Sequence, residues 1–194
     1  MNIINSEQVT PQKIQTSPIF LVVGPPAVGK STTSRVLASH FSKSVHIPVD
    51  DLRNMVVSGL LLPGPVWSDE LAQQVALARK VAINIAVNYR QAGFAVVMDD
   101  FWDSDHLSDY QGLFDQPGVH KILLLPDQAA AFQRNRKRSG GDTGNGYINE
   151  GIRIVYEQIS REATGGQTNK WLVIDTTKMD AEATVEYILT HCQL

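Results

Sequence analysis

The chain has 194 residues, a hydrophobic fraction of 43%, a charged fraction of 19% and a formal net charge of −3. These values predict one α/β domain with a substantial core, and they exclude general electrostatic attraction to nucleic acid or anionic membranes. The single cysteine, Cys192, excludes disulfide scaffolding and cysteine-rich metal sites. No apolar run is long enough to span a bilayer, so we expect a cytoplasmic protein without a membrane partner, either a monomer or a homodimer.

In chain order, residues 1–17 are predicted to be a loose leader and residues 18–194 a single domain. Continuous apolar runs predict buried strands at 19–23, 45–49, 94–98, 120–125 and 171–175. Helical periodicity predicts helices at 32–40, 51–57, 69–92, 107–114, 127–138, 148–159 and 181–191, with Ser68 capping the third. Strands that alternate with helices are typical of a parallel sheet covered on both faces.

The stretch from Gly24 to Ser31 reads Gly-Pro-Pro-Ala-Val-Gly-Lys-Ser. It follows the first apolar run and precedes the first helical pattern, which is the strand–loop–helix setting of a phosphate-binding P-loop. Backbone N–H groups at a helix N-terminus, together with the helix dipole, attract polyanions. Ala27 departs from the glycine that often stands there, and because alanine adopts positive φ less readily, we expect a stiffer loop.

Each P-loop residue type suits one part of a magnesium nucleotide. Gly29 allows close backbone approach to a phosphate, Lys30 reaches the β- and γ-phosphates, and the Ser31 hydroxyl is a Mg²⁺ ligand. Thr32 is placed to hydrogen-bond the α-phosphate. The sequence therefore predicts ATP and Mg²⁺ as cofactors, with a nucleotide site formed by Gly24, Pro26, Ala27, Val28, Gly29, Lys30, Ser31 and Thr32.

Acidic residues follow three of the predicted strands, at 50–51, 99–100 and 127, at the sheet edge where open α/β folds bind ligands. Asp50 would accept the proton of a substrate hydroxyl near the γ-phosphate, and Asp99 would hold Mg²⁺ with Ser31. Asp50 and Asp51 could instead only begin a helix, and which of the two is the base is open. Further candidate substrate contacts are Arg53, Asp100 and Trp102, the last in an aromatic pair that could equally be the edge of the core.

Arg134 and Arg138 lie four residues apart on one predicted helix face, before a Gly-rich stretch. Guanidinium groups stack on bases and bind phosphate oxygens, so residues 134–153 are predicted to form a lid that closes on the nucleotide. The alternative explanation is that cations at a helix C-terminus complement its dipole. The five histidines show no metal-ligand spacing and are expected to be structural or exposed.

Together the P-loop, the strand end 49–53, the strand end 97–100 and the basic segment 132–138 resemble P-loop kinases of the nucleoside-monophosphate-kinase type. Within these, the chain is similar to the branch that holds chloramphenicol phosphotransferase, zeta toxins and small AAA-like ATP-binding proteins. The resemblance implies a five-stranded sheet of order 2-3-1-4-5. It also implies transfer of the ATP γ-phosphoryl group, with Asp50 as base, Arg134 over adenine and Arg138 on the phosphates.

The chain departs from nucleoside-monophosphate kinases after the third strand, where Asp-Gly-aromatic-Pro-Arg is replaced by the sequence of residues 99–103, Asp-Asp-Phe-Trp-Asp. The arginine that would bind a monophosphate is missing, which favours a neutral hydroxylated acceptor, held in part by the segment 51–92. The prediction is an ATP- and Mg²⁺-dependent small-molecule kinase. The alternatives are a nucleoside or nucleotide kinase, an ATP-binding switch or ATPase, and a polynucleotide kinase, which the acidic balance disfavours.

Overall fold

The computed structural model describes residues 17–64, 66–140, 146–162 and 170–193. Its centre is a five-stranded parallel sheet of order β2-β3-β1-β4-β5, which confirms the predicted fold class and strand order. The strands are β1 (Ile19–Gly24), β2 (Ser44–Pro48), β3 (Ala95–Phe101), β4 (Val119–Leu124) and β5 (Leu172–Ile174). Nearly all of the predicted leader lies outside the described residues. The division of the chain into leader, acceptor-side segment and lid stays a prediction.

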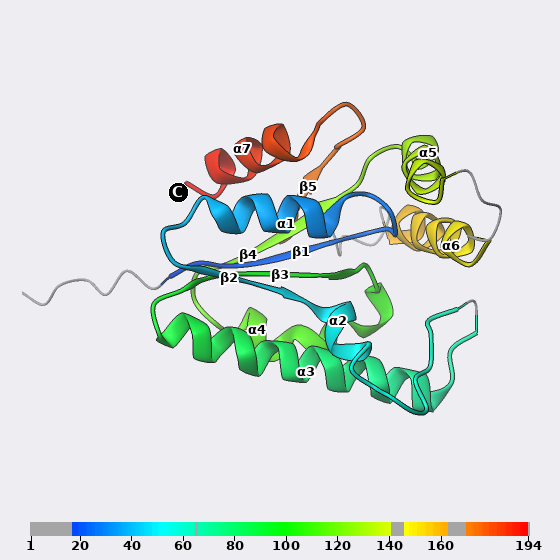
Figure 1. Cartoon of the computed structure of the whole chain (residues 1–194), viewed down its shortest axis with the longest axis horizontal. Helices are drawn as coiled ribbons and strands as arrows, with labels where there is room; N and C mark the ends of the chain where they lie inside the picture. Colours follow the sequence, from blue (N-terminus) through cyan, green and yellow to red (C-terminus); the bar gives the residue numbers. More distant parts are fainter. Residues whose placement is uncertain (1–16, 65, 141–145, 163–169, 194) are drawn as a thin grey trace, which may run out of the picture.

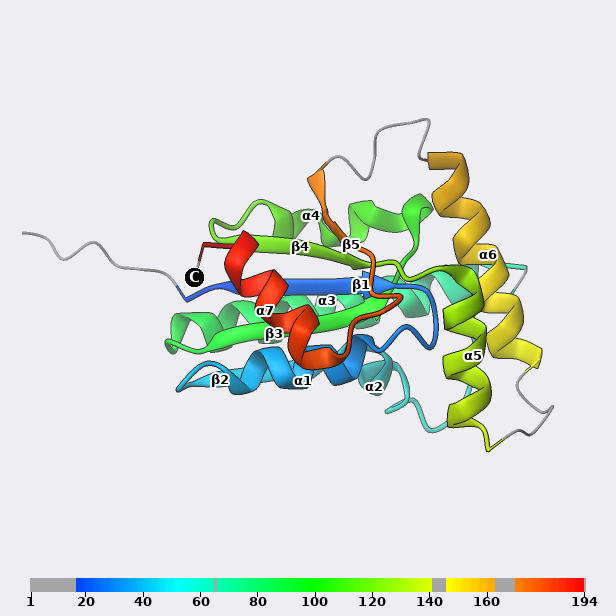
Figure 2. The ribbon, with the colours of Figure 1, turned by 90° about the horizontal axis from the view of Figure 1, so that it is seen from above.

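Helices cover both faces of the sheet (Figure 1). One face carries α1 (Lys30–Ser39) and α7 (Ala181–His191), and the other carries α3 (Asp69–Gln91), the 3-10 segment η1 (Ser104–Tyr110) and α4 (Gln111–Phe114). The short α2 (Val49–Arg53) follows β2. Seen from above, α5 (Gln128–Arg138) and α6 (Gly146–Glu162) lie side by side beyond the carboxyl end of β1 (Figure 2). In the described ranges, no helix is both long and apolar enough to cross a membrane.

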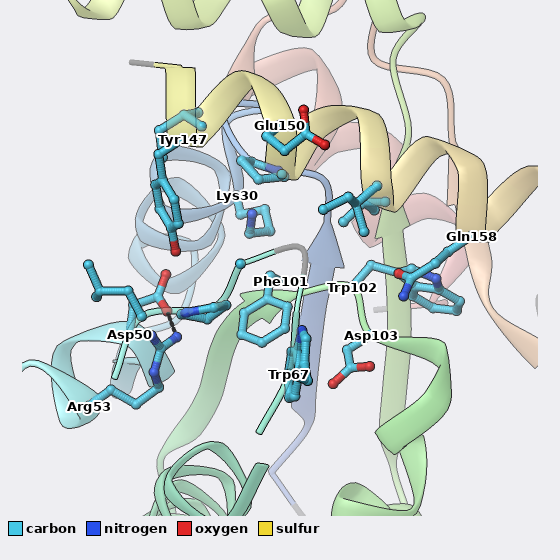
Figure 3. A pocket seen from close by; sticks show the side chains of 18 of the residues that line it. Lys30, Asp50, Arg53, Trp67, Phe101, Trp102, Asp103, Tyr147, Glu150 and Gln158 are labelled. Carbon is cyan, nitrogen blue, oxygen red and sulfur yellow. Dashed lines mark hydrogen bonds and ion pairs between the residues drawn. The ribbon is translucent and has the colours of Figure 1, made fainter. Parts of the chain in front are cut away.

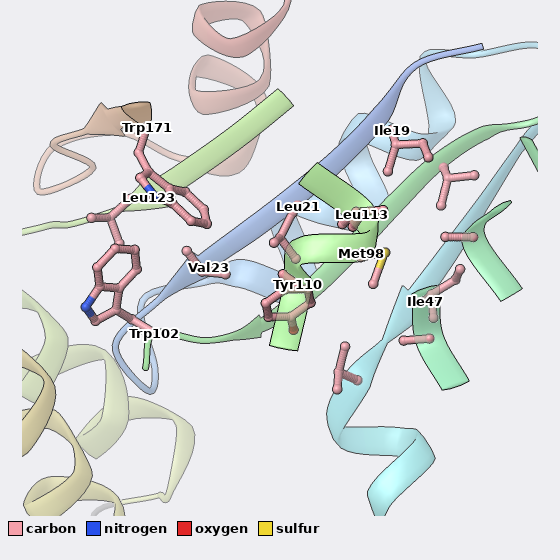
Figure 4. Close-up of a cluster of buried hydrophobic side chains, with 14 of the residues drawn as sticks. Ile19, Leu21, Val23, Ile47, Met98, Trp102, Tyr110, Leu113, Leu123 and Trp171 are labelled. Carbon is pink, nitrogen blue, oxygen red and sulfur yellow. The ribbon is translucent and has the colours of Figure 1, made fainter. Parts of the chain in front are cut away.

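Successive side chains of a strand point to opposite faces of the sheet, so the core is divided into two clusters, one on each face. Ile19, Leu21 and Val23 of β1 pack toward α3 with Met98 and Tyr110, in the cluster shown in Figure 4. The intervening residues of β1 pack toward α1 and α7, with a cluster that contains Phe20, Val22, Leu37, Val97, Ile122, Val185 and Ile188. Both faces of β1 are therefore fully buried, as its continuous apolar run predicts.

Three predicted elements differ from the structure in ways that bear on the site. Strand β3 continues to Phe101, so that Asp99 and Asp100 pair with Val22 and Val23 of β1 instead of following the strand. Helix α2 ends at Arg53, four residues earlier than predicted. The predicted helix 107–114 is a 3-10 segment followed by one α-helical turn. The predicted cap of α3 is confirmed, because the Ser68 side chain accepts a hydrogen bond from Leu71 N.

Gly24 ends β1 where the backbone of β4 comes very close. A Cβ atom on Gly24 would lie 2.4 Å from the carbonyl oxygen of Leu124, a backbone atom that cannot rotate away. We therefore expect Gly24→Ala to lower the free energy of unfolding by about 3 kcal/mol, as for overpacked core sites. Urea denaturation measures this loss. Gly112→Ala is the control, because a Cβ atom there meets no atom within 4 Å; equal stability of both variants would contradict the prediction.

Candidate active site

The P-loop joins the carboxyl end of β1 to the N-terminus of α1 at the centre of the sheet edge. Two of its residues have left-handed backbone, Ala27 with φ 63° and Gly29 with φ 100°. A left-handed alanine costs about 1 kcal/mol relative to glycine, so this loop holds its curved path against a local preference. The first N–H groups of α1 have no partners within the helix and are available to an anion.

Lys30 is the cation of this loop. Its Nζ donates hydrogen bonds to the carbonyl oxygens of Pro25 at 2.9 Å and Gly24 at 3.2 Å, which holds the ammonium group beside the loop. Burial lowers the pKa of Lys30, while the negative charges of Asp50, Asp99 and Asp100 act to raise it. The predicted phosphate-binding lysine therefore lies within electrostatic reach of the acidic residues that we predicted at the same edge of the sheet.

Asp99 and Asp100 point to opposite faces of β3 because neighbouring residues of a strand alternate in direction. The Ser31 hydroxyl donates to Asp99 Oδ1 at 2.8 Å. The other oxygen of Asp99 forms a very short hydrogen bond with Nε2 of His46 on β2. His46 was expected to be structural or exposed, and its contact is structural: it holds the carboxylate that faces the P-loop serine.

Ser31 and Asp99 are suited to Mg²⁺. Both supply hard oxygen atoms, and their side chains already meet at the junction of P-loop and β3. Among the described residues, no group of three or more His, Cys, Asp or Glu side chains could hold a metal. Mg²⁺ in nucleotide sites is held by one or two protein oxygens, with substrate phosphates and water as the other ligands, so the pair fits this ion.

Asp100 lies on the opposite face, away from the P-loop. Its carboxylate accepts hydrogen bonds from Arg79 Nε at 2.9 Å, from Tyr110 Oη at 2.6 Å and from the Phe101 backbone at 2.8 Å. Arg79 also pairs with Asp103 and Asp109. We predicted that Asp100 contacts the substrate, but its side chain is wholly buried and hydrogen-bonded to other residues of the chain. Because β3 extends through Asp100, the Asp100 side chain lies on the buried face of the strand, where it pairs with Arg79 and stabilises the fold.

Arg79 is the centre of this buried network. Burial alone would lower the pKa of Arg79, but Asp100, Tyr110 and Asp103 raise it on balance, so the guanidinium stays charged.

We expect Arg79→Met to lower the free energy of unfolding by about 4 kcal/mol, because it leaves buried carboxylates without their cation. Chemical denaturation measures the loss. Lys80→Met, at an exposed neighbouring position of α3, should change stability by less than about 0.5 kcal/mol; a similar small effect of Arg79→Met would contradict this role.

Asp50 is the first-turn acid of α2, directly after β2. Arg53 donates to its Oδ1 at 2.8 Å from one turn along the helix. The side chain of Asp50 is 60% exposed because it faces an open cavity, while Arg53 is 94% buried in the cavity wall. Desolvation and the nearby charge of Asp100 raise the pKa of Asp50 against the opposing effect of Arg53 and Lys30. A carboxylate with a raised pKa beside a phosphate-binding lysine is suited to general base chemistry.

A cavity of about 280 Å³ opens between the P-loop, α2, the segment 62–67, the end of β3 and α6 (Figure 3). Its described lining includes both Lys30 and Asp50. Aromatic side chains supply much of the remaining wall, and they come from three separate elements: Trp67, Phe101, Trp102 and Tyr147. The cavity therefore places a pocket for a small molecule directly against the reactive end of the P-loop.

Of the aromatic residues, Trp102 was predicted as a substrate contact. It lines the cavity but is only 1% exposed, and it packs edge-on against Trp171 at 5.2 Å between ring centroids. Tyr147 was not predicted. It projects from α6 toward Asp50 (Figure 3), and burial together with the charge of Asp50 raises its pKa although Arg53 opposes the shift. Trp67, also in the cavity lining, lies within the predicted acceptor-side segment 51–92 but was not named as a site residue.

Arg134 and Arg138 approach the P-loop from α5 in different ways. Arg134 donates to the carbonyl oxygen of Val28 at 2.9 Å and to that of Thr176 at 2.6 Å, so it joins the P-loop to the segment after β5. Arg138 is exposed, and its charge contributes to the lowered pKa of Lys30. The middle of the predicted lid, 141–145, lies outside the described residues. The roles of both arginines toward a nucleotide stay predictions.

The sequence was compared with models of known protein families. A family model described as an AAA domain matches residues 19–146. The chain belongs to this AAA-domain family. The matched range starts with β1, contains the P-loop, Asp50 and Asp99, and ends at the first residue of α6. A comparison with curated proteins gave no match.

Solved structures share the fold of this AAA-domain protein over most of its length. Shikimate kinase from Acinetobacter baumannii, in complex with shikimate, has a TM-score of 0.62 at 17% identity, covering 92% of this chain and 94% of that one. The tunicamycin resistance protein of Deinococcus radiodurans has the same TM-score and identity, with coverages of 92% and 97%. A gluconokinase from Sinorhizobium meliloti has a TM-score of 0.59 at 14% identity, with coverages of 92% and 93%.

Proposed function

We propose that this AAA-domain protein is an ATP- and Mg²⁺-dependent kinase that phosphorylates a hydroxyl group of a small molecule. The observation that carries the proposal is that one cavity is lined by both the P-loop lysine and a carboxylate with a raised pKa, Lys30 and Asp50. Ser31 and Asp99 meet beside them. The kinases among the structures of similar fold support phosphoryl transfer as the reaction class.

Asp50 is the proposed general base. Bound ATP would supply the γ-phosphoryl group, and Mg²⁺ held by Ser31 and Asp99 would neutralise part of its charge. The carboxylate of Asp50 would accept the proton of the acceptor hydroxyl and align its oxygen for in-line attack. Arg53 keeps this carboxylate in place through its 2.8 Å ion pair.

Cations of the chain would stabilise the charge that develops during transfer. Lys30 is buried at the P-loop, where an ammonium interacts strongly with phosphate oxygens because water is largely excluded. Arg138 lies within electrostatic reach of Lys30, and Arg134 holds the backbone of the P-loop from α5. Closure of the segment 134–153 over the nucleotide would exclude water from the reaction.

The test is an assay of label transfer. The purified protein is incubated with Mg²⁺, γ-labelled ATP and a panel of neutral alcohols, nucleosides and nucleoside monophosphates, and both ADP and labelled products are measured. We expect a labelled alcohol. Transfer to a nucleoside monophosphate would favour the nucleotide-kinase alternative. Formation of ADP without any labelled organic product would favour an ATPase or a conformational switch.

A further inference from the structure

We infer that the acceptor is an uncharged alcohol that carries an aromatic or other flat ring, and that Trp67 is the main residue that selects for the ring. This inference rests on the proposed function, since it names the substrate class for the same cavity. It goes beyond a neutral hydroxylated acceptor because it specifies how the cavity binds the part of the molecule that does not react.

The cavity wall opposite the P-loop is aromatic. Trp67 stacks on His106 with ring centroids 4.9 Å apart and an interplanar angle of 12°, and it lies 6.3 Å from Phe101 at 58°. Phe101 itself is held between two guanidinium groups, with Arg79 at 5.0 Å and Arg53 at 5.8 Å from its ring centroid. The two aromatic side chains are thus fixed at an angle to each other on the cavity side (Figure 3).

The support for this wall lies in the buried ionic network beneath it. His106 Nδ1 contacts the carboxylate of Asp103 at 3.0 Å, and Asp103 in turn pairs with Arg79 at 3.1 Å. The chain from Arg79 through Asp103 and His106 to Trp67 fixes the orientation of the indole although it belongs to a loop. A rigid aromatic surface recognises a flat apolar ring with little loss of side-chain entropy.

The charged residues of the cavity wall do not favour an anionic acceptor. Among its described residues, the carboxylates already have cationic partners: Asp50 pairs with Arg53, Asp103 with Arg79, and Glu150 with Arg153. The cations of the described lining are Lys30, which belongs to the P-loop, and Arg53, which Asp50 neutralises. A carboxylate or phosphate on the acceptor would lose its hydration without gaining an unpaired cation, which is strongly unfavourable.

The test measures binding to the full chain, with Mg²⁺ and a non-hydrolysable ATP analogue present. The probes are a fragment library of aryl alcohols, each matched by an aryl carboxylate of the same ring and by an alcohol without a ring; one such set is 1-phenylethane-1,2-diol, mandelate and propane-1,2-diol. Ligand-observed NMR finds binders and calorimetry gives their affinities. We expect the aryl alcohols to bind at least about tenfold more tightly than either of their matched partners.

Trp67→Ala links the preference to the wall. We expect it to weaken aryl-alcohol binding about tenfold without changing the affinity for the ATP analogue, whereas Tyr187→Ala on α7 changes neither. Tighter binding of the carboxylates or ring-free alcohols, no binding by any aryl alcohol, or an unchanged preference in Trp67→Ala would each overturn the inference. None of these results affects the proposed function as long as the ATP analogue binds; failure of the analogue to bind would overturn the proposed function itself.

Discussion

Lys30→Ala is expected to lower the rate of phosphoryl transfer by about a thousandfold, because it removes the cation at the P-loop that faces the transferring group. The structure gives the reason for so large an effect. The ammonium is buried, donates to two backbone carbonyls of its own loop, and is surrounded by carboxylates that favour its charged form. Affinity for ATP should fall as well. Label transfer and calorimetric titration with ATP measure the two effects.

The loss should not come from unfolding. Because burial lowers the pKa of Lys30, its ammonium destabilises the folded chain; this penalty is full below the lowered pKa of the folded lysine, shrinks as the pH rises through it, and is gone above the pKa of the unfolded lysine. Alanine removes the penalty, so the melting temperature of Lys30→Ala should be unchanged or higher. Lys80→Ala, at an exposed site of α3, is the matched control. Transfer close to the wild-type rate would contradict the assignment of the P-loop.

Asp50→Asn is expected to lower the rate of transfer by at least about a hundredfold while the affinity for Mg²⁺ and ATP is retained, because asparagine cannot accept the proton. Asp51→Asn is the matched control, since Asp51 is an exposed neighbour on the same helix and lies outside the cavity lining. Equal losses of transfer rate in both variants would show that the two acids stabilise the start of α2 and that Asp50 is not the base. A loss confined to Asp51→Asn would make Asp51 the base.

The pH dependence gives a second readout for Asp50. The active form of a base is deprotonated, so the rate should rise with pH through an apparent pKa above the ordinary aspartate value, and this limb should vanish in Asp50→Asn. A carboxyl group with a raised pKa in the folded state stabilises the fold at low pH, and this contribution is lost as the pH rises through that pKa. Asp50→Asn should therefore not lower the melting temperature at neutral pH.

The fold and the nucleotide end of the site could be predicted because their determinants are local in the sequence. The P-loop spans eight residues with a strand before and a helix after, and each buried strand is a continuous apolar run. The rule that ligands bind at the carboxyl ends of parallel strands then brought Asp50 and Asp99 to the P-loop. In the structure, Asp50 lines the cavity with Lys30, and Asp99 accepts a hydrogen bond from Ser31.

The acceptor side could not be predicted in the same way because its residues meet only through tertiary structure. The partner of Asp100 is Arg79, 21 residues away in the sequence on α3, and neither residue alone indicates an ion pair. Apolar periodicity does not show that β3 continues through two aspartates, and that continuation is what turns Asp100 away from the P-loop. Tyr147 projects from α6 toward Asp50, and His46 on β2 forms a hydrogen bond with Asp99; no spacing rule relates either pair.

The central claim is that Lys30, Ser31 and Asp99 together bind a magnesium nucleotide at the edge of the sheet. Calorimetric titration of the protein with a non-hydrolysable ATP analogue, with Mg²⁺ and again with EDTA, tests it most directly. We predict one site per chain, weakened at least about tenfold by EDTA and by Asp99→Asn. No binding of the analogue, or binding that is indifferent both to Mg²⁺ and to Asp99→Asn, would contradict this account.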